Sequence, residues 1–485
     1  MKKFRWYDHL SVNLFWLGLN IRNTAVGSVF TPYLVALFVA EGRQNTALGF
    51  ISTAGLIIAM LVQPAAGLLS DRSTSRYGKR RPYIFFGTLF DLVFLSAIFL
   101  AAIAHSGNFW ILLVATLLIQ FSANVSHGPL QGLIPDIVPE EQRGRSSAIK
   151  AVMELIPIVL VGFTIAQLVG KGHFGWAIFV TGLALLLTML LTMMLVKEEP
   201  LKEKPTTSFK IPMLRVLGVL AGIGLGAIAG LIGGGAVGGL IGLAAWPYVG
   251  KATALAIMVG LGGVVAMVVA VVSGVWSGAL ATLGKDARHN SSFTWWVVNR
   301  LLFLAAATSF QGFLPFFLMY AFKVSAEEAA SINGTLMTII GLFIMISAFA
   351  GGWVSDRFGK RRMVALSGLV SAAGACMVLG AIWVPKMAII YAAGSVIGLG
   401  VGIFMTANWA LGTDLVPAGE AGRYLGISNL AGAGAGMIGK GIGGPIADYL
   451  NLYRPGLGYF AIFASYAVLF ALSTVSLRWV KKTTK

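Results

Sequence analysis

Residues 67–81 read Gly67-Leu-Leu-Ser-Asp71-Arg72-Ser-Thr-Ser-Arg-Tyr-Gly78-Lys-Arg-Arg81, and a second version of this stretch appears later in the chain. Residues 352–362 read Gly352-Trp-Val-Ser-Asp356-Arg357-Phe-Gly359-Lys-Arg-Arg362. Both copies place an Asp-Arg pair between a glycine and a basic run, and the first copy carries four extra residues, Ser73 to Arg76. A repeated charged motif of this length indicates an internal structural repeat.

Two further matches support the duplication. Arg22 and Arg300 are separated by the same number of residues as Asp136 and Asp414. A second motif also keeps its internal spacing in both copies, Asp136-Ile-Val-Pro139 with Gly144-Arg145 and Asp414-Leu-Val-Pro417 with Gly422-Arg423. The sequence therefore predicts two homologous six-helix halves, at about residues 1–196 and 292–485.

The composition predicts a membrane protein. Soluble domains carry about 25% charged residues, whereas this chain is 11% charged and 57% hydrophobic, with a mean hydropathy of +0.83. Runs of about 20 apolar residues are typical of membrane-spanning helices, so we expect an all-α polytopic fold with about fourteen spans. The expected spans are 11–38, 47–69, 83–104, 109–133, 147–170, 174–196, 213–245, 251–282, 292–320, 329–353, 363–383, 387–412, 424–449 and 457–480.

An insert lies between the two halves. Each half has an even number of spans, so the insert must also hold an even number, and residues 212–284 are long enough for two. The predicted organisation is an N-terminal six-helix bundle at 1–196, a cytoplasmic linker at 197–211, an inserted Gly-rich transmembrane hairpin at 212–284 and a C-terminal six-helix bundle at 285–485.

Glycine recurs at every fourth position of the insert from Gly218 to Gly242. Small residues at this spacing let helix backbones approach closely in lipid. The stripe favours packing against the second helix of the hairpin, residues 251–282. Contact with the core or self-association with another copy of the chain is an alternative, and so is a pore-lining face.

The distribution of the basic residues explains the net charge of +18 by membrane topology and not by nucleic-acid binding. If both termini are cytoplasmic, the cytoplasmic segments hold 27 of the 36 Lys and Arg residues and the opposite loops hold six, which is the positive-inside bias. We expect a multi-pass protein of the plasma or inner membrane. The five histidines are scattered and no phosphate-binding loop appears, so we expect no enzyme activity, no cofactor and no metal site.

At the Asp71 and Asp356 loops the chain resembles the major facilitator superfamily, whose signature is Gly-x-x-x-Asp-Arg-x-Gly-Arg-Arg. The longer first copy and the stretch from Gly128 to Asp136 resemble the glycoside–cation symporters and plant-type sucrose carriers. The resemblance implies two six-helix bundles and secondary active transport of a sugar or glycoside by alternating access. Residues 47–69 contain no acidic residue for a sodium ion, which favours proton coupling or facilitated flow.

The motif loops predict a gate on the cytoplasmic face. Asp71 can pair with Arg143 or Arg145, and Asp356 can pair with Arg423. Such pairs would hold the two bundles in one orientation and break in the other; the basic runs can instead serve only membrane topology. The expected gating residues are Asp71, Arg72, Arg145, Asp356, Arg357 and Arg423.

Ionisable residues inside spans are costly and are functional hypotheses by default. Arg22 and Glu154 lie at similar depths in helices that pack together in the resembled family, so we expect them to form a proton-coupling pair. A static structural pair is the alternative. Asp91 is expected to be structural, and Lys440 could line the cavity or serve packing.

Polar and aromatic side chains recur on single faces of helices that line the central cavity in the resembled family. Amide and indole donors beside aromatic rings suit a hydroxylated small-molecule substrate, although the same side chains could only bridge helices. The expected substrate-binding residues are Asn20, Asn23, Gln120, Asn124, His127, Gln131, Trp296, Asn299, Arg300, Asn408 and Trp409.

Three other functions stay open at this point. An organic anion such as a sugar acid could place its carboxylate on Arg300. Drug or lipid export uses the same motif loops. A receptor or assembly factor without transport activity could use the inserted hairpin to bind a partner, but retention of both Asp-Arg loops and of the deep charges argues against it.

Overall fold

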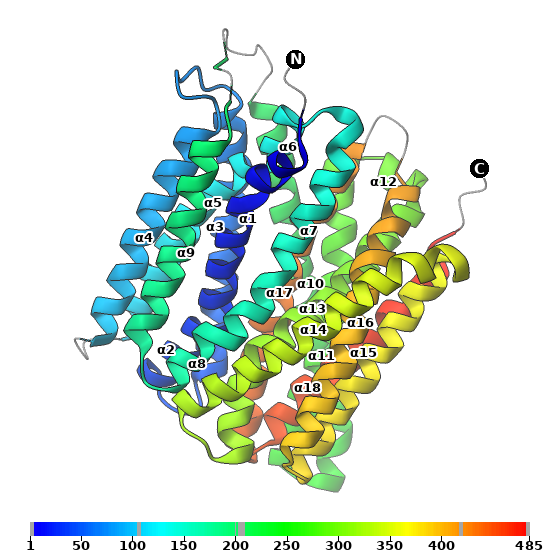
Figure 1. Cartoon of the computed structure of the whole chain (residues 1–485). Coiled ribbons are helices and arrows are strands. Elements are labelled where there is room, and N and C mark those ends of the chain that lie inside the picture. Colours follow the sequence, from blue (N-terminus) through cyan, green and yellow to red (C-terminus); the bar gives the residue numbers. More distant parts are fainter. Residues whose placement is uncertain (1–3, 104–107, 199, 202–208, 417–420, 482–485) are drawn as a thin grey trace. The chain divides into compact units, whose positions relative to one another are not determined.

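A computed structural model describes residues 4–103, 108–198, 200–201, 209–416 and 421–481, and these residues form helices without any strand (Figure 1). In a bilayer, a helix satisfies its own backbone hydrogen bonds, which explains this architecture. The N-terminal half contains α1 (Trp6–Ala25), a π-helical turn (Val26–Phe30), α2 (Thr31–Phe38), α3 (Gln44–Ser70), α4 (Arg81–Ile103), α5 (Phe109–Gln131), α6 (Leu133–Ile137), a 3-10 turn (Glu140–Gln142), α7 (Arg143–Leu160), a π-helical turn (Val161–Ile165), α8 (Ala166–Gly170) and α9 (Phe174–Leu195).

The insert and the C-terminal half are built from longer uninterrupted helices. The insert contains α10 (Lys210–Val249) and α11 (Lys251–Leu283), followed by the short α12 (Asp286–His289). The C-terminal half contains α13 (Ser291–Phe322), α14 (Ala326–Phe358), α15 (Lys360–Trp383), α16 (Met387–Asp414), α17 (Ala421–Tyr453), α18 (Leu457–Ser476) and a 3-10 turn (Leu477–Trp479).

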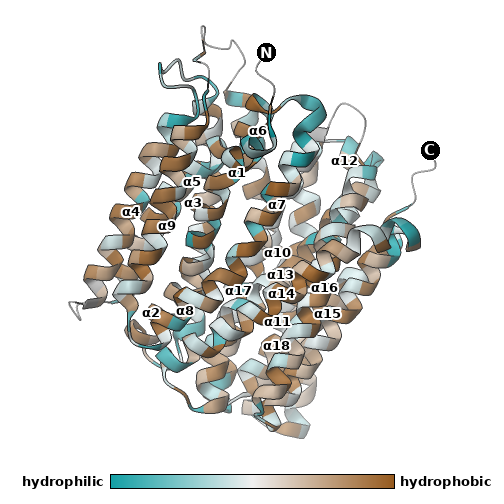
Figure 2. Cartoon of the chain, viewed as in Figure 1, coloured by the Kyte–Doolittle hydropathy of each residue, from teal (hydrophilic) through white to brown (hydrophobic). Residues whose placement is uncertain are grey.

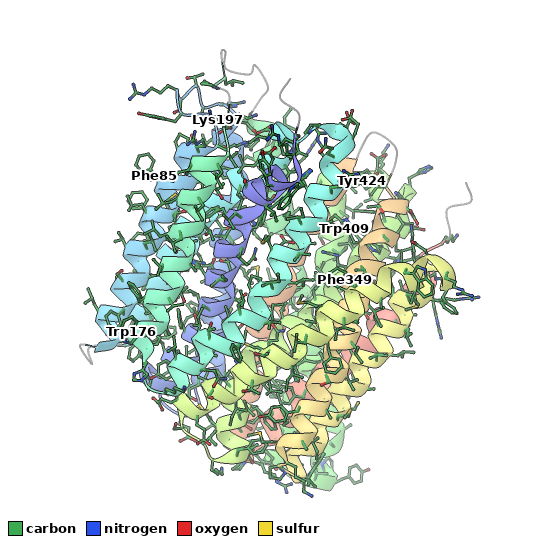
Figure 3. The ribbon with its side chains drawn as sticks, in the orientation of Figure 1. Phe85, Trp176, Lys197, Phe349, Trp409 and Tyr424 are labelled. Atoms are coloured by element: carbon green, nitrogen blue, oxygen red, sulfur yellow. The ribbon has the colours of Figure 1, made fainter. Side chains whose placement is uncertain are left out.

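Among the residues that the structure describes, twelve helices are long and apolar enough to cross a membrane. The helical stretch 6–38 and α17 are of spanning length but are not among the twelve. Both carry polar or charged residues in their middle, such as Arg22 and Lys440. The fold class is confirmed, whereas the count of fourteen spans stays a prediction. Hydrophobic residues run along most of α4 and α9 (Figure 2), and Phe85 and Trp176 on these helices point away from the bundle (Figure 3).

The chain divides into two compact units that do not coincide with the sequence halves. Unit 1 holds residues up to Phe38, Ile57–Leu214 and Ala326–Thr338, and unit 2 holds Val39–Leu56, Arg215–Ser325 and the chain from Ile339 onwards. The first turns of α14 therefore pack with N-terminal helices, and the first turns of α3 pack with C-terminal helices. The predicted boundaries at residues 196 and 285 stay predictions.

Specific hydrogen bonds hold these helix ends in their units. In unit 1, Ser331 of α14 donates from Oγ to Oε1 of Gln167 at 2.6 Å. In unit 2, Asp448 of α17 accepts from Nδ2 of Asn45 at 2.8 Å and from the backbone N–H of Thr46 at 2.7 Å. Asp448 thus caps the start of α3.

The glycine stripe packs against the second helix of the hairpin, as the first of the three alternatives predicted. A Cβ atom added to Gly226 would lie 2.5 Å from the Cα atom of Gly274, and one added to Gly230 would lie 2.5 Å from the Ala266 carbonyl oxygen. By contrast, a Cβ added to Gly235 or Gly239 meets nothing within 4 Å. The stripe is therefore used inside the hairpin, and self-association stays a prediction.

These glycines supply a matched pair of substitutions. Gly230→Ala pushes a methyl group into the backbone of α11, so we expect the free energy of unfolding to fall by about 1–3 kcal/mol. Gly239→Ala adds the same methyl group to an open face of α10 and should be neutral or stabilising by up to about 1 kcal/mol. Denaturation of both variants in detergent checks this pair, and equal effects would contradict the packing.

Candidate functional site

In unit 2, five residues that the sequence predicted to bind substrate lie together on α13 and α16. Asn408 donates from Nδ2 to Oδ1 of Asn299 at 2.7 Å and accepts on its own Oδ1 from Nη1 of Arg300 at 3.2 Å. Trp296 donates from Nε1 to the Asn408 carbonyl oxygen at 3.0 Å. The Arg300 guanidinium carbon lies 5.3 Å from the ring centre of Trp409, which is within cation–π range.

Burial divides this Arg300 network into a supporting part and an accessible part. Trp296, Asn299 and Asn408 are each 0% exposed, so they support the site by joining helices. Trp409 (labelled in Figure 3) is 37% exposed, and Arg300 is half-buried. The Arg300 Nε–H has no hydrogen-bond partner in the described part of the chain. This Nε atom is itself buried, so Trp409 is the most exposed side chain of the network.

In unit 1, a second group of polar residues surrounds Trp16. Its ring lies 5.2 Å from that of His127 in an edge-on arrangement, and Lys150 Nζ lies 4.1 Å from its centre. Lys150 forms an ion pair with Glu154 at 3.2 Å, and Gln131 Nε2 lies 3.5 Å from His127 Nε2. This Trp16 cluster, made of these five residues, joins α1, α5 and α7.

The other polar residues predicted on α1 and α5 bond mainly within their own helices. Asn20 and Asn124 each donate to the backbone carbonyl four residues earlier, at 2.8 and 2.7 Å. Asn23 accepts from Nη1 of Arg22 at 2.7 Å, and Gln120 is partly buried. Substrate contact by these four residues stays a prediction.

Arg22 forms a buried ion pair with Asp91 of α4. Asp91 Oδ1 accepts from Nη2 at 2.8 Å and from Nε at 3.1 Å, and both side chains are only 1% exposed. Arg22 Nη2 also donates to the Ile119 carbonyl oxygen at 2.7 Å. The guanidinium group thus connects α1 with α4 and α5, and this enclosed pair supports the structural role that the sequence favoured for Asp91.

The expected pair between Arg22 and Glu154 does not form. Depth along the helix axis was the basis for that expectation, but an arginine reaches only the helices that its own face meets. The Trp16 face of α1 meets α7, whereas Arg22 lies on another face and meets α4. Glu154 is 38% exposed and pairs with Lys150, four residues earlier on α7. The spacing of Lys150 and Glu154 could have revealed this pair in the sequence.

At the end of α3, Arg80 is the centre of a charged cluster. Its guanidinium donates to Asp136 Oδ2 at 2.9 Å and to Ser70 Oγ at 2.7 Å, and it forms an ion pair with Asp71. Gly132 leaves room for this group, because a Cβ atom there would overlap the guanidinium. The sequence predicted Arg143 or Arg145 as the partner of Asp71. Arg80 is closer in the chain and takes that place, while Arg143 donates to backbone carbonyls.

Glu198, which the sequence analysis missed, holds the start of α4 beside this cluster. Its carboxylate accepts from the backbone N–H of Arg80 at 2.9 Å and from that of Arg81 at 3.3 Å. Burial raises the pKa of Glu198 above its ordinary value, and the two N–H donors oppose that shift. Gly78 has a φ of +101° and packs against Glu198, which explains a glycine at this turn. No local sequence pattern links residues so distant in the chain.

The C-terminal copy of the motif forms only part of the same arrangement. Lys360 pairs with Asp414 at 2.7 Å, as Lys79 pairs with Asp136 at 3.0 Å in the N-terminal copy. Arg361, the counterpart of Arg80, has no ion pair among the described residues. The two copies therefore share one salt bridge and differ at the arginine that follows it.

The remaining predicted gating residues lie at the edges of these motifs. Arg72 lies 5.7 Å from the ring centre of Phe209 and Arg357 lies 5.9 Å from that of Trp353. Arg145 and Asp356 are exposed, and the side chain of Arg423 lies outside the described residues. A gating role for the six residues stays a prediction. The described residues include no group of three or more His, Cys, Asp or Glu that could hold a metal ion.

Comparison with known proteins relates this geometry to a family. The sequence profile of the Major Facilitator Superfamily matches residues 19–217, 214–440 and 300–485. Sucrose transport protein SUT1 of Oryza sativa subsp. japonica is 31% identical over 139 residues, which are 25% of this chain and 25% of that protein. Proton-associated sugar transporter A of Rattus norvegicus is 27% identical over 209 residues, 38% of this chain and 27% of that protein. The chain spans about a quarter of the length of these curated relatives.

Solved structures share the fold over nearly the whole chain. A D-xylose-proton symporter has a TM-score of 0.63 and 14% identity, with 99% of both chains covered. An auto-inhibited POT family peptide transporter has a TM-score of 0.65 and 13% identity, with 98% of this chain and 97% of that chain covered. At this identity, the likeness concerns the fold alone.

The buried Arg22–Asp91 pair predicts a large effect on stability. Asp91→Asn leaves the Arg22 guanidinium in the protein interior without a counter-charge, so we expect the free energy of unfolding to fall by about 3–5 kcal/mol. Glu154→Gln removes a partly exposed ion pair and should lower the free energy of unfolding by less than about 1 kcal/mol. Thermal denaturation of the two variants in detergent measures the difference. Equal effects would show that Asp91 is not structural.

Proposed function

This chain belongs to the major facilitator superfamily, and we propose that it is a secondary active transporter that carries a sugar or glycoside by alternating access, coupled to protons. Membership in this family makes it a multi-pass membrane transporter and not an enzyme. The relatives named as sucrose and proton-associated sugar transporters support a hydroxylated substrate and a proton as co-substrate. Location in the plasma or inner membrane with both termini cytoplasmic is part of the proposal.

The Arg300 network is the observation that carries the choice of substrate. Trp409 offers an exposed indole ring, and the Arg300 guanidinium lies beside it, with its Nε–H buried and without a partner among the described residues. A sugar presents apolar C–H faces that pack on aromatic rings and hydroxyl groups that accept hydrogen bonds. Few polar groups placed among aromatic side chains are typical of small-molecule sites.

A sugar acid is the second candidate, and one observation favours it. Arg300 has no acidic partner among the described residues; its contacts are Asn408 and two tryptophan rings. An arginine without a counter-charge inside a membrane protein can bind a carboxylate through two parallel hydrogen bonds. Both candidates use the same site and differ only in the charge of the ligand.

For the coupling step, we propose that Glu154 takes up the proton. Its basic partner is Lys150 and not Arg22, which the sequence had suggested. The Glu154 side chain is 38% exposed, whereas Asp91 is enclosed with Arg22 and only 1% exposed. Protonation of Glu154 removes its negative charge and releases Lys150, which already lies over Trp16. A change in charge at this contact biases the equilibrium between two conformations.

The Arg80 cluster fits the proposed gate at the motif loops. Its ion pairs join α3 to α6, which precedes the coupling helix α7. Because ion pairs either form or break, such a cluster suits a two-state switch. The incomplete C-terminal copy supports unequal roles for the two loops.

Glu154→Gln tests the coupling proposal. The variant keeps the shape of the side chain and cannot lose or gain a proton, so we expect it to lose accumulation of labelled substrate driven by a proton gradient. Exchange of labelled for unlabelled substrate needs no net proton movement and should continue. Both are measured in proteoliposomes with Asp91→Asn as a second variant. If the Glu154→Gln variant still accumulates substrate in proportion to the proton gradient, Glu154 is not the site of proton uptake.

Arg300→Gln separates the two substrates. The variant removes the charge and keeps hydrogen-bond donors, so the apparent Kd should rise by about tenfold for a neutral glycoside and about 100-fold for a sugar acid. Thermal-shift titration of the purified chain with sucrose, a phenyl glycoside and glucuronate measures both, with Arg478→Gln as a control of equal charge change. Binding of all three at wild-type strength would remove Arg300 from the site.

A further inference from the structure

A groove in unit 2 lies between the inserted hairpin and the C-terminal helices, outside the proposed transport site. It has a volume of about 470 Å³, within the range of about 300–1,000 Å³ that small-molecule sites occupy. Helix α11 forms one wall, and the end of α17 and the start of α18 form the other. The lining is Thr253, Ala256, Ile257, Gly260, Leu261, Val264, Leu450, Tyr453, Arg454, Leu457, Phe460, Ala461 and Ala464.

Small residues on both walls keep this groove open. On α11, Gly263 packs directly on Ile446 of α17, next to the groove. Beside it, Gly260 has only Leu450 near its missing side chain, 3.8 Å from an added Cβ. On α18, Ala461 and Ala464 present only methyl groups to the same space. A larger side chain at these positions would fill the groove.

The groove changes from polar to apolar along its length. At one end, Tyr453 Oη and Thr253 Oγ1 lie 2.9 Å apart in a hydrogen bond, next to Arg454 in the loop between α17 and α18. The wall from Thr253 to Val264 is about 16 Å long at 1.5 Å per residue, and it becomes entirely apolar. Because helix ends meet at the polar end, this end lies near the membrane surface.

The charge at the polar end is positive. Arg454 is exposed and has no ion pair within the described ranges, and Lys251 begins the same end of α11. The helices that line the groove have membrane-spanning length, so lipid is the solvent around it. A ligand that fits both ends has an anionic head and an alkyl chain.

We propose that this groove binds one anionic glycerophospholipid, with its phosphate head on Arg454 and an acyl chain between α11 and α18. The lipid then fills the space that the hairpin leaves beside the C-terminal helices. The inserted hairpin thereby acquires a function as one wall of a lipid site. A cationic residue near the membrane surface favours an anionic over a zwitterionic lipid by about fivefold.

Native mass spectrometry of the delipidated full chain, titrated with dioleoyl-phosphatidylglycerol or dioleoyl-phosphatidylcholine, tests this proposal. The wild type should bind one lipid with about a fivefold preference for phosphatidylglycerol. Arg454→Gln should abolish the preference, and Arg288→Gln, a change of equal charge elsewhere in unit 2, should keep it. Ala461→Phe should remove this lipid, while Leu369→Phe on the exposed face of α15, outside the groove lining, should retain it.

Each opposite result overturns the proposal. Binding of the lipid by Ala461→Phe at wild-type strength would place it outside the groove. A preference that survives Arg454→Gln, or no preference in the wild type, would remove the head-group site. Circular dichroism of each variant confirms that it is folded, and Ala461→Ser adds little volume and should still bind.

Discussion

A charge inside a bilayer has no water to solvate it, and this cost explains where the deep ionised groups of this protein lie. Arg22 is enclosed with Asp91 and with a backbone carbonyl, so its charge is neutralised where it stands. Arg300 contacts an amide and two indole rings, and it has no acidic partner among the described residues. The first arrangement neutralises the charge inside a bundle, and the second leaves a cation that the proposed ligand would meet.

The same cost separates the two carboxylates that could carry a proton. Asp91 is held in place by Arg22, and a change of its charge would disturb three helices at once. Glu154 is partly exposed and pairs only with a lysine on its own helix, so loss of this pair costs little stability. In the proposed function, stability and coupling therefore belong to different carboxylates of the same unit.

Much of the fold was predictable because its signals are periodic or repeated. The duplicated motifs predicted that the two copies correspond, although the equivalent pairs Lys79–Asp136 and Lys360–Asp414 were not themselves predicted, and the glycine spacing predicted the packing of α10 on α11. The resemblance to the family placed the helices of Trp296, Asn299 and Asn408 around one cavity, and these residues do lie together. The prediction of which residues pair between helices was wrong for Arg22 and Glu154. The position of a residue along its helix axis does not determine which face of α1 meets α7. Glu198 was missed because only the folded chain brings it to the start of α4.

If the protein is a proton-coupled transporter, the entry of substrate alone must carry protons across the membrane. Proteoliposomes that contain the wild-type chain and a pH-sensitive dye, with no imposed ion gradient, receive a sugar, a glycoside or a sugar acid from outside. We expect acidification of the lumen on addition of at least one of them, since a coupled transporter must bring protons with the substrate. Uptake of labelled substrate without any change of internal pH would contradict proton coupling, and the absence of both signals for all three would contradict the proposed transport function.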